Sequence, residues 1–276
     1  MLVNDFDIFQ PEQAEEDYIN PEDGLLYCGK CHTPKQKKFD KGLVFGNLKT
    51  HPILCRCASE QKEKEDAERR EFARKNMIQQ LRMEAFRDVP GALWRFESSR
   101  MTHQLEMAQR FVEHWDEFRK DGMGLLLFGD VGTGKSYAAG CIANALIEQG
   151  HSVLYVCLSD IVNHMQGCYG SDRESYTKTL LKPELLILDD LGAERNTSFG
   201  KEQVLDVINK RTLSGKPMIV TTNIPLHIMQ NATDTGERRI YDRILAVCTP
   251  IRFDGENFRK GIAAENRTKA AALLRK

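Results

Sequence analysis

The sequence has no long apolar run and almost no net charge. Its longest apolar stretches, such as residues 124–128 and 185–188, are far shorter than the roughly 20 residues of a membrane-spanning helix. The N-terminus, MLVNDFDIFQ, lacks the basic start and apolar segment of a secretory signal peptide. A net charge of −1 excludes a chain that attracts nucleic acid through its overall charge. We therefore expect a cytoplasmic protein with no membrane segment.

Charge and cysteine are unevenly distributed along the chain. Residues 1–27 carry eight acidic residues and no lysine or arginine, whereas residues 28–51 carry six lysines and a single acid, Asp40. This asymmetry is typical of an interaction arm followed by a small basic module. Four of the eight cysteines fall in residues 1–57, and in a reducing compartment we expect thiols or metal ligands rather than disulfides.

Composition divides the chain into three regions. Residues 1–57 have few periodic apolar positions, so their cysteines are expected to hold together an acidic arm and a four-cysteine module. Residues 58–88 are predicted to be a helical linker, because residues 58–86 contain no glycine or proline, with Ser59 as the N-cap. Sparse apolar positions favour a solvated linker helix, and a partner-binding helix is the alternative. Residues 89–276 form the third region.

The third region alternates apolar strands with helices. Strands are predicted over residues 123–130, 151–158, 184–190 and 216–223, and helices over residues 136–150, 159–170 and 200–215. Short apolar strands separated by helices are typical of a parallel sheet with helices on both faces, so the predicted fold class is α/β. The alanine-rich C-terminal tail is predicted to be a surface helix.

The first of these strands runs directly into a phosphate-binding motif. Residues 129–136, GDVGTGKS, fit the pattern G-x-x-x-x-G-K-[ST] between a strand and a helix, which is the context that the motif requires. Its glycines allow successive backbone N–H groups to face a phosphate at the positive end of the helix dipole. Lys135 is expected to reach the β- and γ-phosphates of ATP, and Ser136 to ligate Mg²⁺. The predicted nucleotide-binding residues here are Gly129, Asp130, Val131, Gly132, Thr133, Gly134, Lys135 and Ser136.

Polar residues at the ends of two later strands support this site. Asp189 and Asp190 follow the apolar run 185–188, and the carboxyl ends of parallel strands lie beside bound phosphates. We expect Asp189 to bind on the Mg²⁺ side and Asp190 to polarise the attacking water, with Glu194 as a weaker alternative base. Asn223 ends the next strand and is placed to hydrogen-bond the γ-phosphate or the water.

The cysteines of the first region have the spacing of a structural zinc site. Cys28 and Cys31 form a C-x-x-C pair, and Cys55 and Cys57 form a C-x-C pair after a 23-residue insertion. Short pairs of this kind clamp a tetrahedral zinc ion from two turns. His32 or His51 is close enough in sequence to replace one sulfur. The other cysteines lie in apolar strands or helices and are expected to be packing residues: Cys141, Cys157, Cys168 and Cys248.

The order of motifs resembles a known family. The series GDVGTGKS, LLILDDLGAE, TTN, GERRIYDR and FRKG is similar to the AAA+ ATPases of the DnaC/DnaI type, which are replicative helicase loaders, over about residues 90–276. The resemblance implies a P-loop AAA+ core. It also implies that Arg243 is the arginine finger that reaches the ATP of a neighbouring subunit, and that Arg259 is the second sensor arginine. For Arg243, the alternative is a basic surface cluster with Arg238 and Arg239. Asp190 stands where many AAA+ enzymes have glutamate, a form that related loaders share.

The same resemblance suggests partners. Similar loaders place a single-strand-binding element after the second strand, where Tyr169 would stack on a base and Arg173 and Lys178 would follow the phosphates. A packing helix followed by a solvated basic loop is the alternative. DnaI-type loaders also carry a metal-bearing N-terminal domain that contacts the helicase.

These expectations combine into one function with two rivals. We expect an ATPase that loads a hexameric replicative helicase onto single-stranded DNA and self-assembles on it, with ATP, Mg²⁺ and Zn²⁺. A transposition helper ATPase shares the core but usually lacks a four-cysteine arm. A zinc adaptor with little ATPase activity is the other rival, and the intact Lys135, Ser136 and Asp189 count against it.

Overall fold

The computed structural model describes residues 16–39, 49–87, 91–98, 101–193 and 197–274. Most of the predicted acidic arm and Glu194, the alternative base, lie outside these residues. The chain divides into two compact units, residues 1–75 and 76–276. Within the described residues, no helix is long and apolar enough to cross a membrane.

The N-terminal unit contains two small antiparallel hairpins. Strand β1 (Tyr18–Ile19) pairs with β2 (Leu26–Tyr27), and β3 (Gln36–Lys38) pairs with β4 (Thr50–Pro52). Among the described residues of this unit, the only buried hydrophobic side chains are those of Cys28 and Cys55. These hairpins therefore have almost no apolar core, and the cysteines lie where a core would be.

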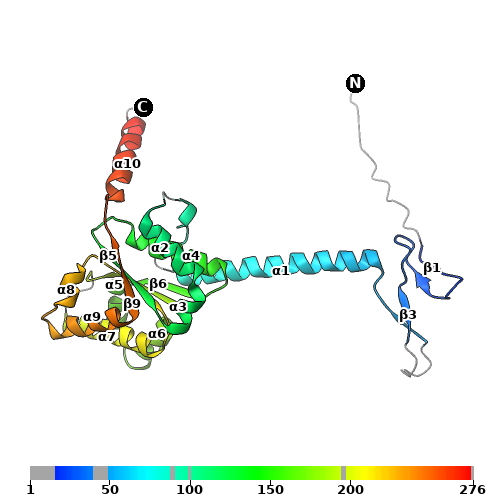
Figure 1. Ribbon diagram of the computed structural model, residues 1–276, viewed down its shortest axis with the longest axis horizontal. Coiled ribbons are helices and arrows are strands. Elements are labelled where there is room, and N and C mark those ends of the chain that lie inside the picture. Colours follow the sequence, from blue (N-terminus) through cyan, green and yellow to red (C-terminus); the bar gives the residue numbers. More distant parts are fainter. Residues whose placement is uncertain (1–15, 40–48, 88–90, 99–100, 194–196, 275–276) are drawn as a thin grey trace. The chain divides into compact units, whose positions relative to one another are not determined.

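A single long helix, α1 (Arg56–Ala85), follows the second hairpin (Figure 1). Its sequence is rich in helix formers, and most of its side chains are exposed until Ile78. The predicted N-cap was wrong, because the helix begins at Arg56, three residues before Ser59. The backbone N–H of Arg56 donates to the hydroxyl of Thr33 at 2.9 Å, so a residue far away in sequence caps this end.

The C-terminal unit is built on a five-stranded sheet with the order β6-β7-β8-β5-β9, in which every pairing is parallel. The strands are β5 (Gly124–Gly129), β6 (Val153–Cys157), β7 (Leu185–Leu191), β8 (Met218–Thr222) and β9 (Cys248–Phe253). The first four were predicted. The edge strand β9 was not, because its sequence, CTPIRF, mixes exposed polar residues and a proline with its buried positions.

Helices cover both faces of this sheet, which confirms the predicted fold class (Figure 1). Leu125 and Leu127 of β5 belong to one apolar cluster and Leu126 to a second, as the alternation of side chains along a strand requires. The first cluster includes side chains of α1, α2 (His103–Glu113) and α4 (Lys135–Glu148). The second includes side chains of α5 (Leu158–Gly167), α7 (Ser198–Leu213) and α9 (Thr235–Val247).

The remaining helices contribute less to the two clusters, and the last of them contributes to neither among its described residues. They are the 3-10 turn Phe96–Ser98, α3 (Trp115–Asp121), α6 (Ser171–Leu181), α8 (Leu226–Gln230) and α10 (Phe258–Leu274). Helix α6 occupies the segment for which a basic loop was one expectation, because Leu180 and Thr177 are buried and anchor it. Helix α10 is exposed along its described side chains, as predicted for the C-terminal tail.

Candidate nucleotide site and cysteine cluster

The predicted phosphate loop joins β5 to α4 at the carboxyl edge of the sheet. Gly129, Gly132 and Gly134 have φ angles of 137°, 85° and 97°, a region that favours glycine. At Gly129 a Cβ atom would lie 2.0 Å from the backbone oxygen of Phe253 in the neighbouring strand, so both the curl of the loop and this close approach require glycine there. The loop thus has the conformation and the position that phosphate binding needs.

Lys135 is held inside this loop. Its Nζ donates to the backbone oxygens of Gly129 at 2.8 Å and of Asp130 at 2.7 Å. Burial lowers the pKa of Lys135, while the nearby carboxylates of Asp190 and Asp130 act in the opposite direction. Its ammonium group is therefore kept at the loop, among acids and main-chain acceptors.

The two predicted acids lie at a β-bulge. Between the paired positions Leu188↔Val220 and Leu191↔Thr222, β7 advances three residues while β8 advances two. The side chain of Asp189 is buried, whereas Asp190 is exposed and has a φ of 61°. In a regular strand, neighbouring side chains such as these two would point to opposite faces of the sheet. The bulge interrupts this alternation at the two acids.

Thr221 of β8 and Asn223, which directly follows this strand, contact the two acids. The hydroxyl of Thr221 donates to Asp189 Oδ1 at 2.6 Å, and the amide of Asn223 donates to Asp190 Oδ1 at 3.2 Å. The structure therefore brings together Lys135, Asp189, Asp190 and Asn223, which the sequence singled out from three separate segments.

The start of α10 lies against the same loop. The backbone N–H of Phe258 donates to the oxygen of Gly132 at 3.0 Å. The positive charge of the next residue, Arg259, contributes to the lowered pKa of Lys135, so its guanidinium is within electrostatic reach of the loop. Arg259 thus lies beside the phosphate loop of its own chain.

Two features of this edge were not predicted. Tyr155 of β6 is buried, and its hydroxyl donates to the backbone oxygen of Ser136 at 3.3 Å. Burial and the neighbouring carboxylate of Asp189 raise the pKa of Tyr155, so its phenol stays protonated. The sequence signal that could have identified it is a tyrosine in an otherwise apolar strand.

The second feature is a cleft of about 480 Å³ beside Asp130 and Asn223, lined also by Arg252 of the unpredicted strand β9.

The predicted arginine finger lies elsewhere. Arg243 is half-buried on α9, which packs against α7 and α8. Its Nε is buried and has no hydrogen-bond partner among the described residues. Within that part of the chain, no hydrogen bond or ion pair joins Arg243 to the phosphate loop or to the two acids.

The predicted DNA-binding residues lie around the α5–α6 corner. The side chain of Tyr169 is 78% exposed, and Lys178 forms an exposed ion pair with Glu174 at 2.8 Å. Arg173 has contacts within the fold: its Nη2 donates to the oxygens of Met165 and Cys168, and its guanidinium lies 5.3 Å from the ring centre of Phe199. The structure therefore leaves Tyr169 and Lys178 at the surface and uses Arg173 to close the end of α5.

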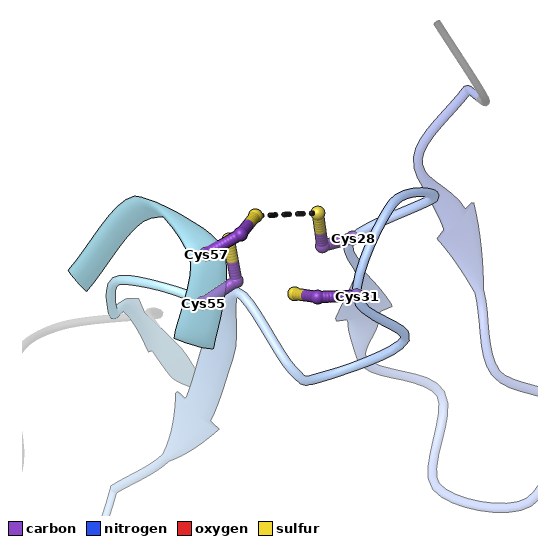
Figure 2. A group of neighbouring side chains, drawn as sticks. All are labelled: Cys28, Cys31, Cys55 and Cys57. Atoms are coloured by element: carbon purple, nitrogen blue, oxygen red, sulfur yellow. Dashed lines mark hydrogen bonds between the residues drawn. The ribbon is translucent and has the colours of Figure 1, made fainter. Parts of the chain in front are cut away.

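The four predicted cysteine ligands converge in the N-terminal unit (Figure 2). Cys28 and Cys31 come from the turn after β2, Cys55 from the connection between β4 and α1, and Cys57 from the first turn of α1. Their sulfurs all lie within 4.8 Å of one another, with 3.6 Å between Cys28 and Cys57 and 3.4 Å between Cys55 and Cys57. Zn–S bonds of about 2.3 Å place tetrahedral sulfurs about 3.8 Å apart, so this cluster fits zinc closely.

The histidines near this cluster have other contacts. The Nδ1 of His32 is 3.3 Å from the hydroxyl of Tyr18, and the His51 ring lies 5.1 Å from that of Phe39. Among the described residues, the group that could hold an ion consists of the four cysteines. A hydrogen bond from the Thr33 hydroxyl is the main cause that lowers the pKa of Cys31 to about 5. The structure therefore favours four sulfur ligands over a mixed set.

Comparison with known proteins matches most of the chain to one protein family. The sequence profile of the "IstB-like ATP binding protein" family matches residues 60–266. "Replicative helicase loader DnaI" of Bacillus subtilis (strain 168) is 31% identical over 160 residues, which cover 54% of this chain and 51% of that protein. "Replicative helicase loader DnaC" of Escherichia coli (strain K12) is 26% identical over 176 residues, covering 62% of this chain and 69% of that protein. This chain thus spans about half the length of the DnaI protein it matches.

Solved structures agree with the sequence comparison. The crystal structure of DnaI has a TM-score of 0.50 at 25% identity and covers 60% of this chain and 90% of that one. The crystal structure of the DnaC helicase loader has a TM-score of 0.51 at 22% identity, covering 58% and 97% respectively, and so supports the fold.

Proposed function

Because the chain belongs to the family of IstB-like ATP-binding proteins, we propose that it is an ATP-dependent loader of a hexameric replicative DNA helicase. Its relatives DnaI and DnaC are replicative helicase loaders, and they supply the class of function. The observation that carries the ATP dependence is the meeting of Lys135, Asp189, Asp190 and Asn223 at one edge of the sheet. The loading site is single-stranded DNA, and the loader assembles on the helicase.

The nucleotide site divides its work among these residues. The backbone N–H groups of the phosphate loop and the ammonium of Lys135 bind the phosphates, while Ser136 and Asp189 hold Mg²⁺. ATP supplies a phosphoryl group whose transfer to water switches the loader between states. Asp190 orients the attacking water, and the hydrogen bond that its carboxylate accepts from the amide of Asn223 supports this assignment. Arg259 supports the phosphates from within the chain.

Arg243 is assigned to a neighbouring subunit's site. Its planar, permanently charged guanidinium suits the charge that develops during phosphoryl transfer. Among the described residues Arg243 makes no hydrogen bond or ion pair with the phosphate loop or the acids, which is compatible with a role across an interface. Self-assembly would then be required for full activity.

The remaining predicted sites are assigned to partners. The exposed Tyr169 and Lys178 are proposed to contact the bases and phosphates of single-stranded DNA, with Arg173 supporting the corner that carries them. The cysteine cluster is proposed to hold one zinc ion in a module that faces the helicase. This module precedes the matched range 60–266, and it favours a loader over a transposition helper ATPase, whose usual form lacks it.

The test combines nucleotide turnover with helicase binding. We expect the full chain to hydrolyse ATP in the presence of a replicative helicase and single-stranded DNA, and to be retained by the immobilised helicase. Lys135→Ala should abolish hydrolysis. Lys210→Ala is the matched control, because Lys210 is exposed and forms a surface pair with Asp206 on its own helix. A wild-type chain that neither binds the helicase nor hydrolyses ATP would contradict the proposed function.

A further inference from the structure

One side chain contacts both acids of the nucleotide site at once. Thr221 lies on β8 with 2% of its surface exposed. Its hydroxyl accepts the backbone N–H of Asp190 at 2.9 Å and donates to Asp189 Oδ1 at 2.6 Å. Because the hydroxyl has a single proton and the N–H can only donate, that proton must point at the Asp189 carboxylate. The hydrogen-bond direction is therefore fixed.

The bulge makes this contact necessary. Asp190 has a φ of 61°, a conformation that residues other than glycine rarely adopt, although aspartate tolerates it better than most. The β7–β8 register shifts at this point, so regular pairing does not determine where Asp189 and Asp190 point. The Thr221 hydroxyl ties the backbone of one acid and the carboxylate of the other to the same atom of the neighbouring strand.

The next residue offers an internal comparison. The hydroxyl of Thr222 is also buried, but it contacts only main-chain atoms: it donates to the oxygen of Leu191 at 2.7 Å and accepts the N–H of Ile224 at 3.0 Å. Adjacent threonines on one strand thus make equally short contacts with different targets. One bonds the carboxylate that faces the phosphate loop, and the other stabilises the chain around it.

We propose that Thr221 is a positioning residue that sets the Asp189 carboxylate for Mg²⁺ and fixes the backbone that carries Asp190. The inference rests on the proposed ATPase function. It predicts that loss of this hydroxyl impairs the metal-dependent step and leaves metal-free nucleotide binding intact, because the phosphate loop itself does not contact Thr221 through any hydrogen bond among the described residues.

The experiment compares four full-length proteins: wild type, Thr221→Val, Thr221→Ser and Thr222→Val. ATP hydrolysis is measured across a Mg²⁺ titration, nucleotide affinity is measured in chelator, and the melting temperature of each protein is recorded. Partners that orient a metal ligand typically contribute about 10–100-fold to metal affinity or activity. Thr221→Val should therefore lose about 10–100-fold in hydrolysis rate or Mg²⁺ affinity, with unchanged affinity for nucleotide in chelator.

The controls separate positioning from folding. Thr221→Ser keeps the hydroxyl and should restore hydrolysis, whereas Thr222→Val should lower the melting temperature while keeping the wild-type Mg²⁺ dependence. If Thr221→Val does not fold, Thr221→Ala replaces it, because it removes the same hydroxyl without adding a methyl group against Asp189.

The possible failures are distinguishable. A wild-type protein without ATPase activity would overturn the proposed function, and this inference with it. A wild type that hydrolyses ATP beside a Thr221→Val protein with the same rate and Mg²⁺ dependence would overturn the role of Thr221 alone. So would a Thr222→Val protein with an equal shift in Mg²⁺ dependence, or a Thr221→Ser protein that is not rescued.

Discussion

Removal of zinc should unfold the hairpins of the N-terminal unit and leave the sheet of the C-terminal unit intact. The buried hydrophobic side chains among the described residues up to residue 75 are Cys28, with 7% of its surface exposed, and Cys55, with 3%. Domains with so little apolar core usually need a metal or disulfides to fold. No disulfide joins these cysteines, which are free thiols in the structure.

The folding free energy that zinc contributes can be estimated from the geometry of the cluster and the strength of zinc binding. Sulfurs of a tetrahedral zinc site lie about 3.8 Å apart. The closest pairs here are 3.4 and 3.6 Å apart and all four sulfurs lie within 4.8 Å of one another, so zinc binding requires movements of no more than about 1 Å. Structural zinc sites supply about 10–16 kcal/mol of apparent binding free energy at pH 7, which in such modules is folding free energy. Two buried side chains cannot replace a contribution of that size.

Elemental analysis and proteolysis test this prediction together. Wild type should carry one zinc per chain, and Cys28→Ser should lose it. Cys168→Ser is the matched control, because Cys168 lies at the α5–α6 corner and outside the cluster, so it should retain the zinc. In Cys28→Ser or in chelator, proteolysis should become fast within residues 16–57 and remain slow within residues 101–193. Absence of stoichiometric zinc in wild type, or equal zinc loss in Cys168→Ser, would refute the reasoning.

Three other substitutions have defined outcomes. Lys135→Ala should abolish ATP binding in a fluorescence titration while the melting curve stays cooperative, since the ammonium is needed for the phosphates, and undiminished affinity would remove the assignment. Arg243→Ala should bind ATP normally and lose stimulated hydrolysis, and mixing it with Lys135→Ala should restore some turnover through hybrid interfaces. Full turnover in Arg243→Ala alone would show that the residue has no part in catalysis. Arg211 is fully buried, and its guanidinium donates to the carbonyls of four residues. Arg211→Leu should therefore lower the unfolding free energy by about 3–5 kcal/mol in a denaturant titration. Lys210→Leu on the same helix should lower it by less than about 0.5 kcal/mol.

Local patterns predicted the parts of the fold that depend on nearby residues. The phosphate loop could be located because its glycines, Lys135 and Ser136 have fixed spacing along the chain. Strands β5 to β8 could be located because a parallel strand buried on both faces is a continuous apolar run. The edge strand β9 is covered less completely, so its sequence carries a weaker signal.

Features that depend on distant residues could not be predicted in the same way. The first residue of helix α1, Arg56, bonds the hydroxyl of Thr33, which lies 23 residues earlier on the other side of the β3–β4 hairpin, and no rule for neighbouring residues would find this contact. The different surroundings of Asp189 and Asp190 depend on a register shift against β8, and the Thr221 hydroxyl that bonds Asp189 lies 32 positions away in sequence. The hydrogen bonds of Arg173 within the fold could not be predicted either, because they depend on where the carbonyls at the end of α5 lie in three dimensions.

The central claim is that ATP binding at the phosphate loop drives the placement of a helicase hexamer on single-stranded DNA. The most direct measurement is the amount of purified replicative helicase that becomes bound to circular single-stranded DNA, which has no free end for threading. We expect this amount to rise only when the full chain and ATP are both present, and to stay at background with Lys135→Ala. Equal loading by wild type and Lys135→Ala, or no loading by wild type with ATP, would contradict the account.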